Sequence, residues 1–223
     1  MLALLHLCDS LFPIGSFGYS DGLEAATASG AVTARDDLRA WLDVCLDETI
    51  ARTEGPAVHR AWRATDGLDW SDVIAIDEEL TALRPASASR KSTRAMGRRL
   101  LTTWQQLHPD PRLDQLQSLA RAGRIGPTLP VAFAAASLCG RADAQTAIES
   151  FAYTRLASTV SAAMRLMAIG QTDAHVLLAS ALERVPAIAA GIIARDPHIE
   201  SFAPAMDIMA MTHQYVHSRL FRS

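Results

Sequence analysis

Apolar residues recur at every third or fourth position through almost the whole chain, and no segment shows the strict alternation typical of a β-strand. Alanine, which has the highest helix propensity, is the commonest residue with 40 copies. Aromatic residues, which favour strands, make up only 6%. This pattern predicts an all-α fold. With no linker or repeat in the sequence, we expect a single domain over residues 1–223.

Glycine, proline and capping residues divide the chain into roughly ten helices, which we expect to pack as an orthogonal or antiparallel bundle. Gly55 and Pro56 are expected to break the second of these helices, and Pro186 to break or kink a later one. A first helix is expected to begin at residue 23, and the others cover residues 33–54, 56–66, 69–84, 87–107, 113–122, 127–139, 143–167, 173–195 and 204 towards the chain end.

Charge and lysine content exclude several function classes. The net charge is −3, and 20 arginines accompany a single lysine, Lys91. A P-loop needs a lysine directly after a glycine-rich loop, and none precedes Lys91. The totals also lack the basic excess of a nucleic-acid-binding protein. We therefore expect no bound nucleotide or other cofactor and no nucleic-acid partner.

Cysteine usage and hydropathy indicate the compartment. Cys8, Cys45 and Cys139 are far apart and odd in number, which favours buried thiols in a reducing compartment over disulfides or a zinc site. The first eight residues lack a positively charged start and a cleavage site. The apolar run at residues 129–139 is about half the length that spans a bilayer. The expected location is the cytoplasm, without a membrane segment.

One short motif suggests catalysis. Residues 18–22 match Gly-x-Ser-x-Gly, the nucleophile elbow of a serine hydrolase, with Ser20 as the nucleophile. That elbow needs a preceding strand, which the helical pattern does not predict. The competing interpretation is that Ser20 or Asp21 caps a helix that begins at Leu23.

Two histidines suggest a metal. His213 and His217 are four residues apart on the last expected helix and would share one face. A stable site needs a third ligand and supporting contacts. Asp207 lies too far round that helix to be an obvious partner. The competing interpretation is a surface or interface pair, and we expect no resident metal.

One expected helix carries a basic face. Arg90, Arg94 and Arg98 are spaced four apart, and no acidic residue lies between Glu79 and Asp110. Such a face is most often solvated or neutralised by ion pairs within the chain. A second interpretation is an acidic protein partner, because guanidinium groups match carboxylates with two hydrogen bonds. Nucleic acid is the third.

The chain ends on the tail at residues 218–223, which contains Arg219, Leu220, Phe221 and Arg222. Chain ends fray unless tied down, yet burying a leucine or phenylalanine contributes roughly 1.5–3 kcal/mol. The tail therefore either packs back on the domain or docks into a partner. Arginine beside an aromatic residue is typical of interface anchors.

Several motifs, in order along nearly the whole chain, together resemble the family of urease accessory proteins called UreF. They are DSLFPIGSF at residues 9–17, SDGLE at 20–24, GRRLL at 97–101, the apolar segment 126–140, MRL at 164–166, IGQ at 169–171, and the chain end with His213 and residues 218–223. Tyr19 departs from the pattern, because many members have histidine there.

The resemblance implies an all-α, non-enzymatic chaperone component that forms a homodimer. Its implied partners are a UreD-type protein (also called UreH), a UreG-type GTPase and apo-urease, into which nickel is delivered. The tail would engage the UreD-type partner. The partner-binding residues implied are Arg219, Leu220, Phe221, Arg222, His213, Gln171, Ser20, Glu24 and Arg98. A serine hydrolase using Ser20 and an autonomous nickel-binding protein using His213 and His217 are the alternatives.

Overall fold

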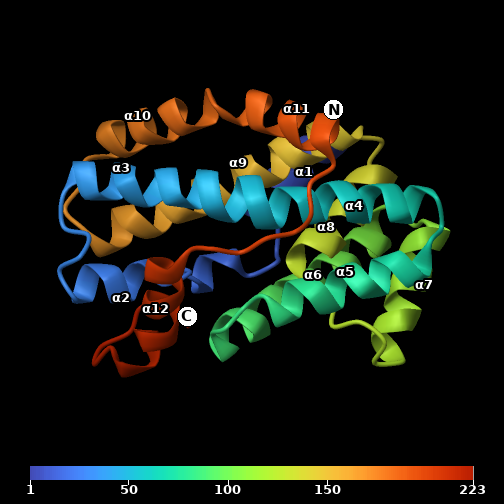
Figure 1. The fold of residues 1–223 in the computed structure, drawn as a ribbon, viewed down its shortest axis with the longest axis horizontal. Coiled ribbons are helices and arrows are strands. Elements are labelled where there is room, and N and C mark those ends of the chain that lie inside the picture. The colour runs from blue at the N-terminus through green and yellow to red at the C-terminus, as the bar shows by residue number, and fades with distance from the viewer. Residues whose placement is uncertain (223) are drawn as a thin grey trace.

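The computed structural model describes residues 1–222, and that part of the chain contains helices and no strand (Figure 1). The predicted all-α fold is confirmed. The α-helices are α1 Leu2–Cys8, α2 Leu23–Ala28, α3 Arg35–Val44, α4 Gly55–Asp66, α5 Trp70–Ala82, α6 Ser87–Leu107, α7 Pro111–Arg121, α8 Leu129–Cys139, α9 Ala144–Leu166, α10 Gln171–Leu182, α11 Val185–Arg195 and α12 Pro204–Thr212. A π-helix, η2 Cys45–Glu54, and two 3-10 turns, η1 Ser16–Gly18 and η3 His213–Tyr215, complete the described elements.

Local capping explains two helix starts that the sequence predicted to within a residue. The carboxylate of Asp69 accepts a hydrogen bond from the Asp72 amide at the start of α5. Asp143 accepts one from the Thr146 amide at the start of α9, at 2.7 Å. These caps satisfy backbone amides that have no partner within the helix.

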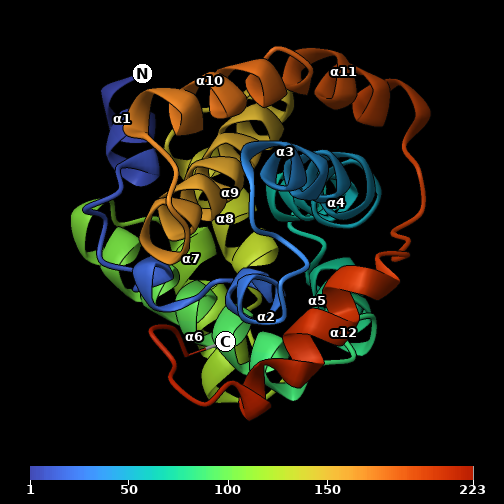
Figure 2. The same cartoon turned by 90° about the vertical axis from the view of Figure 1, so that its left-hand side faces the viewer.

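The helices surround two hydrophobic clusters. The first is built around α8, which is buried over nearly its whole length, and includes Trp104, Phe133 and Phe151. The second lies between α3, η2, α9 and α10, and includes Leu42 and Leu156. Helix α9 contributes to both clusters and thereby joins the two ends of the molecule (Figure 1, Figure 2).

The predicted break at Gly55 and Pro56 is wrong. Helices α3, η2 and α4 follow one another as a continuous rod (Figure 1). The Gly55 amide donates to the Ile50 carbonyl in the wider π-helical pattern. Pro56 has no N–H to donate to the carbonyl of Arg52, which instead accepts from the Glu200 amide at 3.0 Å. A segment almost 150 residues away therefore supplies the bond that proline lacks.

Two other expectations differ at the chain ends. Residues 2–8, for which no helix was expected, form α1. The last helix does not continue to the chain end, because α12 stops at Thr212 and a 3-10 turn at His213 redirects the chain. His213 is 1% exposed, so burial of this side chain accompanies the turn.

No membrane-length apolar stretch was expected, but the 25 residues of α10 and α11 form one. Gln171–Arg195 is long and apolar enough to cross a bilayer, and most of its residues are not buried. The two helices are separated by a turn at residues 183–184, close to the break expected at Pro186. Arg184 in that turn pairs with Asp43, at 2.9 Å, and with Asp47.

Candidate functional site

Four segments from three distant regions of the sequence meet near the end of the chain. They are the opening loop at residues 9–22, the first turn of α2, the last turn of α9, and residues 213–222, which we call together the loop–tail junction. Both ribbon views place the chain end beside α2 (Figure 1, Figure 2). All four segments carry motifs on which the sequence resemblance rests.

Glu24 is the centre of the junction. Its side chain is 5% exposed, and its Oε2 lies 2.6 Å from Nε2 of His213. The backbone amides of Leu220 and Phe221 donate to its two carboxylate oxygens. One buried carboxylate therefore ties both the 3-10 turn and the tail to α2, and these bonds offset its desolvation.

Phe221 anchors the tail to the body of the protein. The side chain is 4% exposed, and the guanidinium carbon of Arg165 lies 4.3 Å from its ring centroid, as a cation–π contact requires. The same guanidinium donates to the Phe17 carbonyl at 2.9 Å. The Arg222 amide donates to the Gly18 carbonyl at 2.7 Å. The tail and the opening loop thus hold each other in place.

Gly22 allows α12 to lie against the start of α2. Its φ is +89°, in the left-handed region that favours glycine. A Cβ added there would lie 2.8 Å from the backbone nitrogen of Ala210 in α12. Since real Cβ atoms do not approach so closely, a side chain at this position would push α12 away from the junction.

The GRRLL motif of α6, residues 97–101, faces the opening loop. A Cβ added at Gly15 would lie 2.5 Å from Nη1 of Arg99, so that guanidinium lies directly over the loop. Gly97 permits another close approach, because a Cβ there would meet the Pro127 carbonyl oxygen at 2.0 Å. The neighbouring Arg98 is exposed on α6 and does not reach the junction.

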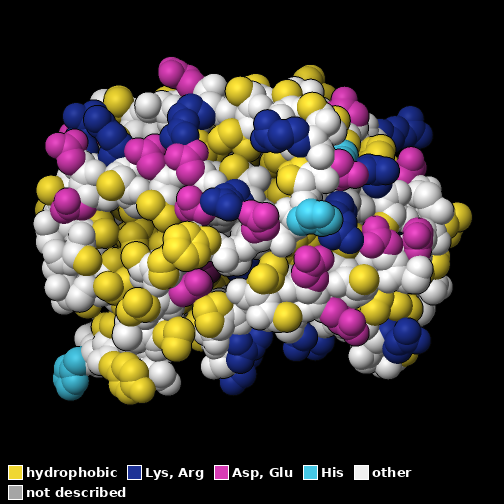
Figure 3. Space-filling view, in the orientation of Figure 1, with side chains coloured by type: hydrophobic (Ala, Val, Ile, Leu, Met, Phe, Trp, Pro, Cys, Tyr) yellow, Lys and Arg dark blue, Asp and Glu magenta, His cyan; other side chains and the backbone are white. Residues whose placement is uncertain are grey.

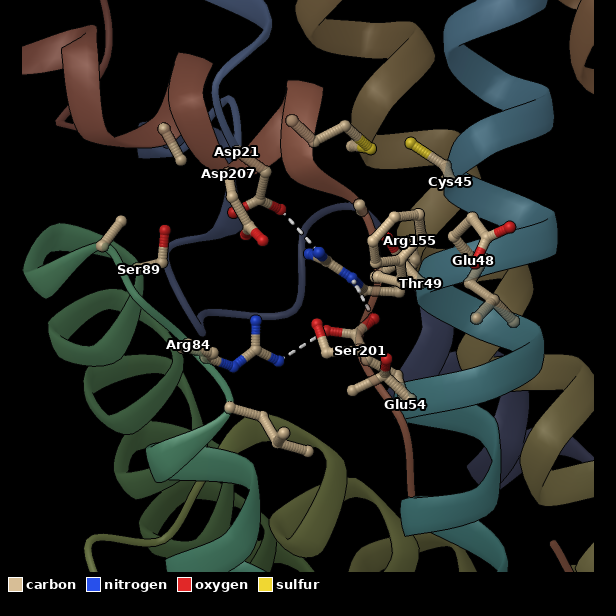
Figure 4. Close-up of a pocket in the computed structure, with 18 of the residues that line it drawn as sticks. Asp21, Cys45, Glu48, Thr49, Glu54, Arg84, Ser89, Arg155, Ser201 and Asp207 are labelled. Atoms are coloured by element: carbon tan, nitrogen blue, oxygen red, sulfur yellow. Dashed lines mark hydrogen bonds and ion pairs between the residues drawn. The ribbon is translucent and has the colours of Figure 1, made fainter. Parts of the chain in front are cut away.

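A chain of charges, half-buried except for the buried Glu54, lies beneath the junction (Figure 4). Arg155 of α9 binds Asp21 at 2.6 Å and Glu54 at 3.0 Å. Arg84 binds the other oxygen of Glu54 at 2.7 Å. Desolvation opposes ionisation of Asp21, but the guanidinium of Arg155 outweighs it and lowers the pKa of Asp21 below its usual value. The network links the opening loop to η2 and α9.

Helix α12 covers this network. Asp207 projects from α12 towards the same space (Figure 4) and lines a small cavity of about 80 Å³ with Arg84, Glu54 and Asp21. Desolvation raises the pKa of Asp207, and the charge of Arg84 only partly compensates. Burial also raises the pKa of the Cys45 thiol, which lines the cavity, to about 12, so this thiol stays protonated. The cavity thus holds charged groups that already bind each other beside an unreactive thiol.

An apolar groove also adjoins the loop–tail junction. Its volume is about 670 Å³, and α1, the opening loop and α9 form its walls. Phe17, Tyr19 and Phe221 line the groove together with Arg165. The thiol of Cys8 also faces it, and burial raises the pKa of that thiol to about 11, so it stays protonated near neutral pH.

The outer surface of the junction is apolar. No residue of α12 is buried, and the helix and its flanks expose five large apolar side chains. They are Phe202 at 68%, Ile208 at 55%, Met211 at 49%, Tyr215 at 78% and Leu220 at 55%. Hydrophobic side chains are dense on this part of the molecule (Figure 3). Exposed apolar clusters of this kind mark interaction surfaces.

The structure brings seven of the nine predicted partner-binding residues to the junction: Ser20, Glu24, His213, Arg219, Leu220, Phe221 and Arg222. Gln171 lies exposed at the start of α10, and Arg98 lies exposed on α6. Arg219 is exposed next to Leu220. Ser223, the last residue of the predicted tail, lies outside the described residues.

The charge network was missed by sequence reasoning. Its members Asp21, Glu54, Arg84 and Arg155 come from four different segments, and Arg155 is 101 residues from Glu54. No local spacing connects them. The role of Arg165 had only one sequence signal, its place in the MRL motif.

The N-cap residue of α2 is Gly22, not Ser20 or Asp21, but the Ser20 hydroxyl still faces the first turn of the helix. Ser20 Oγ accepts a hydrogen bond from the Glu24 amide at 3.4 Å. Residues 1–222 contain no strand to precede the turn, as a nucleophile elbow requires. The histidine of the junction, His213, is bound to Glu24.

The two histidines of the predicted metal pair do not share a helix face. His213 is buried against Glu24, whereas His217 is exposed beyond the 3-10 turn. Within the part of the chain that the structure describes, no group of three or more His, Cys, Asp or Glu side chains is placed to hold a metal ion.

Comparison with known proteins agrees with the motifs. A family model described as UreF matches residues 32–182. The chain is 32% identical over 227 residues to the urease accessory protein UreF of Paracidovorax citrulli, a match that covers 100% of this chain and 89% of that protein. It is 33% identical to the protein of the same name from Pseudomonas paraeruginosa, covering 99% and 98%. The corresponding Azoarcus protein is 31% identical, covering 100% and 95%.

Proposed function

The chain belongs to the UreF family of urease accessory proteins, and from this premise we propose that it is a scaffold of urease maturation with no catalytic activity of its own. In this proposal it joins a UreD-type protein and a UreG-type GTPase to apo-urease, so that nickel enters the urease active site. Nickel is the cargo of the assembly. We place the protein in the cytoplasm, where apo-urease would be found.

The observation that carries the proposal is the exposed apolar surface held on the loop–tail junction. Leu220 and Tyr215 are exposed on backbone that Glu24 and Phe221 fix to the body. An anchored backbone loses little conformational freedom when a partner covers its side chains, which favours tight binding. Phe221 is thus an internal anchor, and Leu220 with Arg219 is the part offered to the UreD-type partner.

The test is co-purification of the chain with a UreD-type protein from the same organism. We expect Leu220→Glu to weaken the complex by about thirtyfold or more, because a central anchor contributes about 2 kcal/mol or more. Deletion of residues 220–222 should have at least the same effect. The matched control is Leu107→Glu, at an apolar residue of α6 that is 48% exposed and far from the junction in sequence.

Circular dichroism of each variant verifies that the helices remain. The tail assignment is wrong if the Leu220→Glu variant and the deletion both bind the UreD-type protein as tightly as the unaltered chain. If only the Leu107→Glu control loses binding, the interface lies elsewhere on the surface.

We also propose that two copies associate through the outer face of α10 and α11. This stretch is apolar, yet most of its residues are not buried. Val176 is 48% exposed and Ile193 is 36% exposed. A second copy of the same surface would cover these side chains, as the isologous interfaces of most homodimers do.

A further inference from the structure

Helix α6 carries a basic face that the rest of the chain does not neutralise. The α6 basic row consists of Lys91, Arg94, Arg98 and Arg99, all of which are exposed. Within residues 1–222, none of the four forms an ion pair. Ion pairs within the described chain therefore do not account for this face.

Nine of the 20 arginines form ion pairs within residues 1–222, and none of these nine lies on α6. Arginines on α3, η2, α4, α9 and the turn after α10 are paired with carboxylates, among them Arg60 with Asp72 and Glu79. Between Glu79 and Asp110 the sequence has no acidic residue. Lysine and arginine side chains gather at the lower edge of Figure 3, where α5 ends and α6 begins.

The geometry of the row suits carboxylates on another helix. Lys91, Arg94 and Arg98 follow one another at spacings of three and four residues, so they lie along one face over roughly 10 Å. Guanidinium groups bind carboxylates through two parallel hydrogen bonds. A protein surface with acidic side chains at the same spacing could satisfy the whole row at once.

Nucleic acid fits the row less well. Single-stranded nucleic acid is held by basic grooves combined with aromatic side chains on which bases stack. The exposed positions between and beyond the basic residues are instead Ala95, Thr102 and Gln106. The net charge of −3 for the chain would also oppose binding to a polyanion.

We propose that the α6 basic row is a docking surface for a carboxylate-rich face of a protein partner. It is separate from the Leu220 surface, although Arg99 connects the two by lying over Gly15 of the opening loop. This inference rests on the proposed scaffold function in one respect, because it adds a second partner-binding surface to the same assembly.

The test uses two helical peptides of equal length, one with three glutamates at four-residue spacing and the other with glutamines in their place. A single-stranded RNA of about 20 nucleotides, long enough to cover a basic groove, is the third probe. Binding to the full chain is measured by fluorescence anisotropy at low and at physiological salt. We expect the glutamate peptide to bind, with an affinity that falls as salt rises, and the glutamine peptide to bind at least about tenfold more weakly.

The deciding variant is Lys91→Glu/Arg94→Glu/Arg98→Glu, which should weaken binding of the glutamate peptide by at least about tenfold. The matched control is Arg141→Glu/Arg195→Glu, which reverses two exposed arginines that lie outside α6 and should leave binding unchanged. Equal binding of the two peptides, tighter binding of the RNA, or an unaffected triple variant would each overturn the proposal.

Co-purification with the UreD-type protein, the GTPase and apo-urease distinguishes this inference from the scaffold proposal. If none of the three binds the unaltered chain, the scaffold proposal fails while the peptide result stands. If all three bind the triple variant as well as the unaltered chain, the basic row has no role in the assembly and this inference fails.

Discussion

Arg165 shows how much one side chain contributes to the junction. Its guanidinium stacks on Phe221 and donates to the Phe17 carbonyl, so it contacts both the tail and the opening loop. A planar guanidinium can do both at once, whereas an ammonium group is a compact point charge. The arginine at this position is therefore required for its shape as well as its charge.

We expect Arg165→Lys to loosen the tail. Losing the stacked contact and the directed hydrogen bond should cost about 1–2 kcal/mol. This raises the equilibrium constant for opening of the tail roughly tenfold. Hydrogen exchange of the Leu220 and Phe221 amides measures that opening directly. Arg195→Lys is the control, at an exposed arginine on α11. Unchanged hydrogen exchange in Arg165→Lys would contradict this prediction, because it would show that a positive charge alone holds the tail in place.

The lowered pKa of Asp110 predicts how the stability of the protein changes in acid. Hydrogen bonds from Arg112, two from its side chain and one from its backbone, lower the pKa of Asp110 from 3.8 to about 2. Because the folded pKa lies below the unfolded one, this stabilisation is complete above pH 3.8 and is lost as the pH falls towards 2.

The variant Asp110→Asn keeps the helix cap but lacks the charge. We expect the free energy of unfolding of the unaltered chain to exceed that of the variant by a constant amount above about pH 4. The excess should shrink between about pH 4 and pH 2. Urea unfolding at several pH values checks this, and an excess that persists at about pH 2 would contradict the assignment.

Among the elements, the rod of α3, η2 and α4 depends most on its surroundings. The π-helical turn and the proline at its end would weaken an isolated helix. In the protein, Glu200 supplies the missing hydrogen bond and Ile192 of α11 packs against Gly55. The rod is therefore continuous because other segments complete it.

We expect Gly55→Ala to destabilise the fold by about 1–3 kcal/mol through overpacking. The added Cβ would lie 2.6 Å from the Ile50 carbonyl oxygen and 2.7 Å from Cδ1 of Ile192. Gly191→Ala is the control within α11, where the nearest atoms belong to the flexible Arg195 side chain. The midpoint of chemical unfolding reports both variants, and equal midpoints for Gly55→Ala and the unaltered chain would refute the packing argument.

For the protein as a unit, the main feature is that three different surfaces lie on one helical body. The apolar surface at the loop–tail junction, the α6 basic row and the outer face of α10 and α11 belong to different elements. Separate surfaces let several partners bind at the same time, which is what a scaffold requires.

The proposed dimer gives a prediction about mass. Light scattering should show twice the chain mass of 24.0 kDa for the unaltered protein. The variant Val176→Glu/Ile193→Glu should have the mass of one chain, because two buried charges per copy would oppose association. Leu107→Glu should remain dimeric. A monomeric unaltered protein would exclude the proposed dimer.

The amino-acid pattern was sufficient for the helical class, for the bounds of α6, and for the starts of α5 and α9 to within a residue. Each of these depends on neighbours within about four residues, because helix hydrogen bonds and caps are local. Sequence motifs also identified most residues of the junction, including Glu24 and His213. They did not indicate what these residues bind.

Local patterns failed where distant segments complete a structure. The rod continues through Pro56 because of Glu200, α12 ends where His213 turns in to Glu24, and Phe221 is buried beside Arg165. Glu24 and the tail amides are almost 200 residues apart, and no periodicity in the sequence encodes such a contact. Packing of the helices decided it, because a buried carboxylate is stable only where hydrogen-bond donors converge on it.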